Sequence, residues 1–366
     1  MHPPLRLDPA ALMGEITAFQ RKLAAGMDNL KHQLEPEYAN TPRELVYRED
    51  KLSVWRMKGQ GKPTAKTPTL IVYALVNTVW MTDLQEDRSM VRNLLEQGED
   101  IYLLDWGYPD AADRWLGLDD YINGYLDRCV DAVCKQAGVD AINLLGICQG
   151  GVFTTCYAAL FPHKVKNLVL TVTPIDFHGD KKSPENGVGY MNLWARSLTP
   201  EDIDLMVDTM GTAPGAMVGL SFLMMNPIGN VTKYTTELVE ILDDEAKLLN
   251  FLHMERWIAD RPGHPGEVMR QWFKDLYQDN KLVRNELVLG GRRVDLRNIT
   301  MPVLNVYAQG DVIVPNACSI SENVRFGTSD YMELAVPGGH IGTFVGGKAQ
   351  KILAPSIAQW LKERTP

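Results

Sequence analysis

The chain has 366 residues, of which 45% are hydrophobic and 23% charged, and its formal net charge is −9. This length and apolar content are enough for one large α/β domain with an insertion. The negative charge argues against a nucleic-acid partner, which would require a basic face.

The cysteines give no sign of a metal site or of a disulfide framework. The five residues are odd in number and lack zinc-binding spacing: Cys129, Cys134, Cys148, Cys156 and Cys318. The amino terminus has no charged-then-apolar signal segment, and no apolar run reaches the roughly 18 residues that span a membrane. We therefore expect a cytoplasmic enzyme with no metal and no transmembrane segment.

Residues 8 to 34 are expected to form an amphipathic helix, because apolar side chains recur there at steps of three and four. This apolar stripe consists of Leu12, Ile16, Phe19, Leu23, Met27, Leu30 and Leu34. Such a stripe usually docks on its own domain, and the alternative is a partner helix. We treat residues 1–40 as an N-terminal helical segment that precedes the main domain.

A hairpin and then alternating strands and helices follow. Residues 45–48 and 52–57 flank a polar turn and predict two antiparallel strands, and residues 59–68 are typical of a loop. The sequence then predicts, in order, a strand at 70–75, a helix at 84–97, a strand at 101–105, a helix at 118–136, a strand at 142–147, a helix at 152–160 and a strand at 165–172. This alternation predicts a doubly wound, mainly parallel sheet.

Cys148 lies between the apolar strand at 142–147 and the helix at 152–160. The segment Gly146-Ile147-Cys148-Gln149-Gly150 fits the G-x-S-x-G nucleophile turn of the α/β-hydrolases, with cysteine in place of serine. Glycines suit a turn that strains the nucleophile's backbone and brings neighbouring backbone close. Taken alone, the pattern is equally consistent with a structural turn around a buried thiol.

An oxyanion hole is expected beside this cysteine. In the α/β-hydrolases one backbone N–H comes from the residue after the nucleophile and another from the loop after the third strand. These donors are Gln149 and Val76, with Asn77 close behind Val76. An ordinary strand-end turn at Val76 is the alternative.

The alternation stops at residue 176 and resumes at residue 299. We expect residues 176–298 to form a cap inserted between the sixth and seventh strands, on a core made of residues 41–175 and 299–366. Half of the sixteen methionines lie in this cap: Met191, Met206, Met210, Met217, Met224, Met225, Met254 and Met269. Flexible thioethers suit a surface that repacks around an apolar chain, and filling of helix cores is the alternative.

Two candidate partners of Cys148 follow the cap. An apolar run at 302–308 leads to Asp311, and a strand-like run at 331–336 leads to His340 in a glycine-rich loop. Each residue alone has an ordinary structural explanation. The order nucleophile, acid, histidine is that of the α/β-hydrolases, and it makes Cys148, Asp311 and His340 the candidate catalytic triad.

A cysteine nucleophile favours acyl transfer over simple hydrolysis. A thiol that attacks a thioester makes another thioester, so the bound acyl group stays activated. An unperturbed thiol is only a few per cent thiolate at neutral pH. His340 as base and the amino-terminal end of the following helix would raise that fraction, and Asp311 would fix the imidazole tautomer.

The chain resembles the catalytic subunit of the polyhydroxyalkanoate synthases, and specifically their short, two-component class III. The resemblance covers nearly the whole chain and shows no departure at Cys148, Asp311 or His340. It rests on these segments: Tyr73-Ala74-Leu75-Val76-Asn77, Gln85-Glu86-Asp87-Arg88-Ser89, Leu104-Asp105-Trp106-Gly107-Tyr108-Pro109, Asp119-Asp120-Tyr121-Ile122, Gly146-Ile147-Cys148-Gln149-Gly150-Gly151, Thr173-Pro174-Ile175-Asp176-Phe177 and Pro337-Gly338-Gly339-His340-Ile341-Gly342.

The resemblance implies polymerisation of (R)-3-hydroxyacyl groups, such as 3-hydroxybutyryl, from coenzyme A thioesters, with coenzyme A as product and no separate cofactor. Cys148 would hold the acyl group, His340 would deprotonate the thiol and then the attacking 3-hydroxyl, and Asp311 would assist the second deprotonation. It also implies a second synthase subunit, a homodimer formed through the cap, and residence on polyester granules. Trp272 resembles a family aromatic residue near the dimer contact. The related class IV differs by its partner.

Two other functions are alternatives to the polyester synthase. A thioesterase or dienelactone-hydrolase-like enzyme would share the cysteine turn, but it would release free acid and would not need so large a cap. A non-enzymatic scaffold on the same fold would need a broken triad.

Overall fold

The centre of the molecule is an eight-stranded sheet. The computed structural model describes residues 8–32, 40–182, 189–225 and 227–364. The strands lie in the order β1-β2-β6-β3-β7-β8-β13-β14, and those from β6 to β14 are parallel. Their bounds are β1 Arg43–Glu49, β2 Leu52–Met57, β3 Thr69–Val72, β6 Ile101–Asp105, β7 Ile142–Ile147, β8 Val165–Thr171, β13 Val303–Ala308 and β14 Tyr331–Val336.

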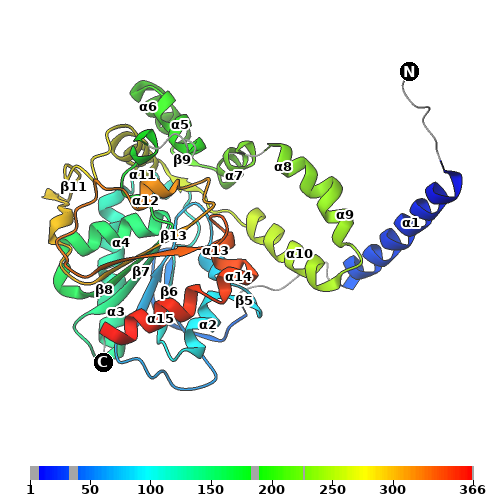
Figure 1. The fold of residues 1–366 in the computed structure, drawn as a ribbon. Helices are drawn as coiled ribbons and strands as arrows, with labels where there is room; N and C mark the ends of the chain where they lie inside the picture. Colours follow the sequence, from blue (N-terminus) through cyan, green and yellow to red (C-terminus); the bar gives the residue numbers. More distant parts are fainter. Residues whose placement is uncertain (1–7, 33–39, 183–188, 226, 365–366) are drawn as a thin grey trace.

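Helices cover both faces of this sheet, as the sequence predicts (Figure 1). The main ones are α3 (Asp127–Ala137) and α4 (Gln149–Leu160) on one face, and α2 (Met90–Glu96) and α15 (Leu353–Arg364) on the other. Short helices follow the last strands: α12 Asn316–Ser319, α13 Gly342–Val345 and α14 Gly347–Gln350. The doubly wound architecture is confirmed.

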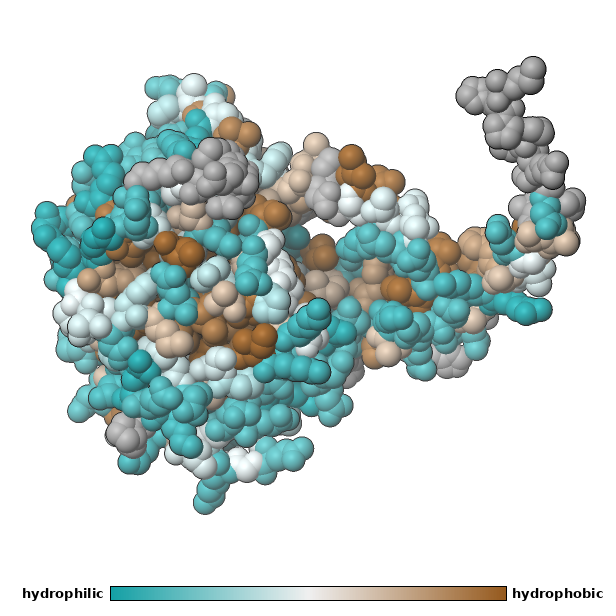
Figure 2. Space-filling view, viewed as in Figure 1, coloured by the Kyte–Doolittle hydropathy of each residue, from teal (hydrophilic) through white to brown (hydrophobic). Residues whose placement is uncertain are grey.

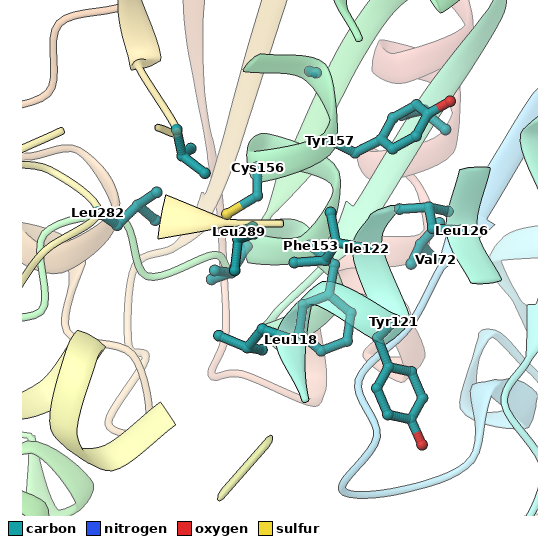
Figure 3. Packing of buried hydrophobic residues seen from close by; sticks show 14 of the residues in the cluster. Val72, Leu118, Tyr121, Ile122, Leu126, Phe153, Cys156, Tyr157, Leu282 and Leu289 are labelled. Atoms are coloured by element: carbon teal, nitrogen blue, oxygen red, sulfur yellow. The ribbon is translucent and has the colours of Figure 1, made fainter. Parts of the chain in front are cut away.

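The central strands are apolar on both sides because both sides are buried. All six residues of β7 are buried; Leu144 belongs to the hydrophobic cluster under α4, whereas Leu145 belongs to the cluster under α15. Figure 3 shows the first cluster, in which Phe153 and Cys156 of α4 lie among side chains from distant segments. A continuous apolar run is the signature of such a strand, and for that reason the predicted bounds of β7 are correct.

The predicted helix at 84–97 is wrong in its first half. The structure has a small hairpin there, formed by β4 (Asp83–Gln85) and β5 (Arg88–Ser89), and α2 begins only at Met90. The buried Asp83 carboxylate accepts hydrogen bonds from the hydroxyls of Thr41 (2.7 Å) and Ser89 (2.6 Å). Ser89 in turn caps α2 by accepting from the Arg92 N–H. Contacts with a residue 42 positions away thus override the local helical pattern.

Two other predicted elements differ in extent. The third strand ends at Val72, not at residue 75, and the predicted helix at 118–136 consists of a π-helical segment, Asp120–Leu126, that continues into α3. At the end of β3, the carbonyl of Tyr73 accepts a hydrogen bond from the Trp106 indole. The chain therefore leaves the sheet earlier than its apolar run suggests.

The cap lies between β8 and β13, which are the sixth and seventh strands of the sheet in chain order. Its helices are α5 Tyr190–Ser197, α6 Pro200–Met210, α7 Gly215–Met224, α8 Pro227–Thr232, α9 Leu238–Ile241, α10 Glu245–Ala259 and α11 Gly266–Gln271, with π-helical segments at Lys233–Glu237 and Trp272–Gln278. Two-residue strands pair β9 (Thr212–Ala213) with β10 (His264–Pro265), and β11 (Val288–Leu289) with β12 (Arg292–Arg293). The division at residues 176 and 298 stays a prediction.

The cap presents apolar side chains to solvent on α7 and α8. Leu220, Ile228 and Val231 are each more than half exposed, and apolar surface is visible on this part of the molecule in Figure 2. From α8 the chain continues through α9 and α10 in an arm that extends away from the sheet (Figure 1).

Helix α1 (Pro9–His32) projects from the end of that arm (Figure 1). Near its carboxyl end the Asn29 amide donates to the carbonyl of Leu242 (3.1 Å). Ile16, Phe19 and Leu23 of the predicted apolar stripe are 42–50% exposed, so this part of the stripe does not dock on its own domain. Leu34 and the side chains of Leu12, Met27 and Leu30 lie outside what the structure describes. Of the described helices, including α1, none is long and apolar enough to cross a membrane.

Candidate active site

Cys148 occupies a strained turn between β7 and α4. Its backbone has φ 54° and ψ −119°, in a region that residues with a Cβ rarely adopt. The Cys148 N–H donates to the carbonyl of Thr171 at 2.9 Å, which ties the turn to the end of β8. The side chain is half-buried. The fold therefore presents the sulfur at the carboxyl edge of the sheet.

The two glycines of the turn are required by close backbone approach. A Cβ on Gly150 would lie 2.2 Å from the carbonyl oxygen of Val72, and one on Gly146 would lie 2.5 Å from Cα of Gly151. Relieving such contacts would require the backbone itself to shift, at a large cost in free energy. The predicted reason for glycine at both positions is confirmed.

The loops after β13 and β14 bring Asp311 and His340 together. The Nδ1 atom of His340 lies 2.7 Å from Oδ2 of Asp311, and both side chains are almost fully buried. The other carboxylate oxygen accepts the backbone N–H groups of Ile313 and Val314, each at 2.9 Å. The carboxylate is thus fixed in orientation, and the imidazole must donate from Nδ1 because its partner is an acceptor.

The imidazole of His340 also lies close enough to Cys148 for the two side chains to interact. With Nδ1 bound to Asp311, the nitrogen that remains for sulfur is Nε2. Burial disfavours the charged ring, but the charges of Asp311 and Cys148 and their hydrogen bonds outweigh it and raise the pKa of His340 to about 10. The site therefore favours a protonated imidazole beside the sulfur, and a neighbouring cation is the setting that activates a cysteine nucleophile.

The predicted oxyanion donors lie on the same side of the sheet as Cys148. Gln149 begins α4, and Val76 follows β3, which is paired with β7. Both residues line one cavity with Cys148. Among the described residues, neither the N–H of Gln149 nor that of Val76 has a recorded acceptor. The two residues predicted to carry the oxyanion donors thus share a cavity wall with Cys148.

An apolar cavity lies between the cap and the carboxyl edge of the sheet. It contains about 860 Å³ of space between atoms, counting the part that opens to solvent. Four of the eight cap methionines line it, namely Met191, Met206, Met217 and Met269. The other walls include Trp194, Phe222 and Phe273. Cys148 lines the cavity as well, so an acyl group on its sulfur has an apolar space beside it.

Sequence reasoning missed three residues near the sulfur. His264 of β10 and Tyr277 line the cavity, and the phenols of Tyr73 and Tyr277 are buried close enough to Cys148 to sense its charge. Burial raises the pKa of both phenols, and the Cys148 charge adds to that effect, so both stay protonated. In the sequence, His264 stands in a Pro-Gly-His-Pro-Gly run, and Tyr73 begins one of the segments that resemble the polyhydroxyalkanoate synthases.

Trp272 points its ring into the same region. It lines the cavity and packs edge-on against Phe153, Phe177 and Tyr277, with ring centroids 5.6–6.4 Å apart. Its expected place near a dimer contact stays a prediction.

The structure also bears on metal binding. In the described part of the chain, no group of three or more His, Cys, Asp or Glu side chains is arranged to hold a metal ion. All five cysteines are free.

Comparison with known proteins identifies the family. The sequence model of the alpha/beta hydrolase fold family matches residues 32–346. The poly(3-hydroxyalkanoate) polymerase subunit PhaC of Allochromatium vinosum is 49% identical over 363 residues, which cover 99% of each chain. That of Synechocystis is 47% identical over 96% of this chain and 92% of its own.

Solved structures agree on the fold. A lipase described as putative, from Sulfolobus solfataricus, matches 88% of this chain and 99% of its own length, with a TM-score of 0.55 at 15% identity. The likeness supports the architecture alone. Because the relatives are nearly half identical along their whole length, the chain belongs to the poly(3-hydroxyalkanoate) polymerase family, built on the α/β-hydrolase fold.

Proposed function

We propose that this chain polymerises (R)-3-hydroxyacyl groups from coenzyme A thioesters into a polyester, through an acyl thioester on Cys148. The observation that carries the proposal is a half-buried thiol, close to a buried histidine–aspartate pair, at the wall of an apolar cavity. The polymerase names of the long relatives give the substrate class.

In the first step the Cys148 thiolate attacks the thioester carbonyl. The carbonyl oxygen becomes an oxyanion that the N–H groups of Val76 and Gln149 stabilise. When the carbon–sulfur bond to the carrier breaks, His340 gives its proton to the leaving coenzyme A sulfur. The products are acyl-Cys148 and free coenzyme A, with a neutral imidazole.

In the second step that neutral imidazole acts as base. Acylation removes the negative charge of Cys148, which is one of the causes that raise the pKa of His340, so the ring is less basic and remains free to accept a proton. It takes the proton of a 3-hydroxyl, and the alkoxide attacks the thioester carbonyl. The ester bond of the polymer forms as the carbon–sulfur bond to Cys148 breaks, which restores the thiolate and the protonated imidazole for the next cycle. Asp311 keeps Nδ1 as the donor during this step.

The apolar cavity supports transfer to an alcohol rather than to water. Its walls are mostly methionine, aromatic and aliphatic side chains, and such a surface suits a polyester chain better than an ordered water. The alternative, a thioesterase or dienelactone-hydrolase-like enzyme, would release soluble 3-hydroxy acid from the same intermediate. Nothing in the lining favours that outcome.

The partners and location are part of the proposal. We propose a second synthase subunit, a homodimer formed through the cap, no cofactor beyond the coenzyme A of the substrate, and residence in the cytoplasm at the granule surface. The exposed apolar residues of α7 and α8 support a contact made by the cap.

The deciding experiment supplies (R)-3-hydroxybutyryl-coenzyme A and follows released thiol and insoluble polyester. Wild type should produce both, and Cys148→Ala should lose at least about 10⁴-fold in coenzyme A release. A stalled reaction should show a thiol-linked oligomer on Cys148 by mass spectrometry.

The matched control is Cys134→Ala, which removes another half-buried cysteine, on α3. It should keep wild-type turnover. Soluble acid as the main product would favour the thioesterase, and unchanged turnover in Cys148→Ala would exclude the mechanism.

A further inference from the structure

A chain of hydrogen bonds joins the cap to the turn after Cys148. His264, in β10 of the cap, has its Nε2 atom 3.1 Å from the side-chain nitrogen of Gln149. The side-chain oxygen of Gln149 accepts the backbone N–H of Leu75 at 2.9 Å. His264 and Gln149 are 4% and 2% exposed. Both line the cavity that contains Cys148.

The backbone groups at the two ends of this chain fix the direction of every bond in it. Nδ1 of His264 lies 3.2 Å from the carbonyl of Pro265, which only accepts, so Nδ1 carries the proton. Nε2 is then an acceptor and receives an N–H from the Gln149 amide. The Leu75 N–H only donates, so the amide oxygen must face it. Burial lowers the pKa of His264 to about 4, and the ring stays neutral at physiological pH.

The side chain of Gln149 connects the two backbone segments proposed to hold the oxyanion. One donor is the N–H of Gln149 itself, at the start of α4. The other is the N–H of Val76, the residue directly after Leu75. If the Gln149 amide turned away, Leu75 would lose its acceptor, and the separation of the two donors would no longer be set. An oxyanion hole loses its effect when its donors move from their positions.

The backbone around His264 is held in a fixed position. Its backbone pairs with Ala213 across the β9–β10 strand pair. On the carboxyl side, a Cβ on Gly266 would lie 2.1 Å from the carbonyl oxygen of Gly211, so the turn after β10 packs backbone against backbone. The backbone of His264 is therefore fixed by the cap, while its Nε2 reaches the core at Gln149.

We infer that His264 is a positioning residue. Through Gln149 it sets the spacing of the two oxyanion N–H groups, so that this spacing depends on the cap being packed against the sheet. The inference rests on the proposed function and adds a role for the cap in catalysis. It gives His264 no contact with the reacting atoms.

The experiment compares His264→Ala with His264→Gln, because the glutamine amide oxygen supplies an acceptor near the place of Nε2. His264→Ala should slow the first release of coenzyme A about 100-fold, comparable with the loss of one oxyanion donor, while KM changes less than about threefold. His264→Gln should recover at least about tenfold of that loss.

A second readout separates oxyanion spacing from nucleophile strength. Alkylation of Cys148 by iodoacetamide, located by mass spectrometry, forms no oxyanion, so its rate should stay within about twofold of wild type in both variants. In a Gln149→Ala background, His264→Ala should add little further loss, because both changes break the same chain of bonds.

The matched control is His253→Gln. His253 is also a buried cap histidine, but it contacts the Gln85 side chain at 3.0 Å and does not line the cavity. It should keep wild-type turnover. A His264→Ala enzyme with native turnover, or alkylation that falls in parallel with turnover, would overturn the inference. If wild type itself releases no coenzyme A, the proposed function fails instead.

Discussion

The sheet loops and the cap contribute in different ways to one site. The loops after β7, β13 and β14 hold Cys148, Asp311 and His340 through short hydrogen bonds among buried groups. The cap supplies most of the cavity wall from helices that are partly exposed, and within the described residues it reaches the turn after Cys148 through His264. The comparison teaches that the reacting groups and most of the substrate space come from separate parts of the chain, which are joined at Gln149.

Among changes that keep the nucleophile, the largest expected effect lies on the sheet side. Asp311→Asn should lower turnover about 10³-fold, because its amide oxygen can still accept the N–H groups of Ile313 and Val314, which turns the amide nitrogen toward Nδ1 of His340. Two donors then oppose each other and the imidazole takes the wrong tautomer. The measurement is first-turnover coenzyme A release.

The control for that change is Asp176→Asn, another buried carboxylate, which is held by Asn280, Ser321 and Asn323. It should lower stability more than turnover. Equal losses of turnover in the two variants would mean that Asp311 acts only through folding.

A smaller effect is expected on the cap side. Met217→Ala removes cavity wall without touching the reacting groups, so KM for 3-hydroxybutyryl-coenzyme A should rise about fivefold, the value of roughly one kcal/mol of apolar contact. The rate of Cys148 alkylation should not change. Met224→Ala, on the same helix but more than half exposed and outside the cavity lining, should leave KM unaltered. A fall in alkylation for Met217→Ala would show that the two regions are not separable.

The smallest expected effect concerns pH. The folded-state pKa of His340 is raised, so its protonated ring stabilises the fold fully below about pH 6.5 and that contribution is lost as the pH rises toward 10. Cys148→Ala removes one of the charges that raise this pKa. The loss of stability should then occur at lower pH than in wild type, with a difference of order 1 kcal/mol in urea unfolding at pH 8–9. Superimposable stability–pH curves would contradict the electrostatic coupling of sulfur and imidazole.

The parallel strands and the residues at their ends were predictable from sequence. The bounds of β6 and β7 agree with the predicted runs, because a strand buried on both faces must be apolar throughout. Those of β14 agree as well, although it is an edge strand whose first three residues are exposed. The loop positions of Cys148, Asp311 and His340 follow from those strands, since the carboxyl ends of parallel strands meet at one edge.

Other features depend on partners that a local pattern does not contain. The β4–β5 hairpin forms because Asp83 binds Thr41 and Ser89, and no periodicity signals that contact. His264 lies in a short Pro/Gly run of the sequence, and it comes close to Gln149 because the cap packs over the sheet. The exposure of Ile16, Phe19 and Leu23 was likewise not predictable, because an amphipathic stripe does not specify what covers it.

The burial of helix α4 limits where the site can be altered. From Gln149 to Ala159 every residue is buried, and its first turn packs against the carbonyls of β3. The scaffold behind the sulfur therefore has little tolerance for altered side chains. Adaptation to monomers of another length must act through the opposite wall, so chimeras that exchange α5 to α7 between relatives are the natural route to polyesters of new composition.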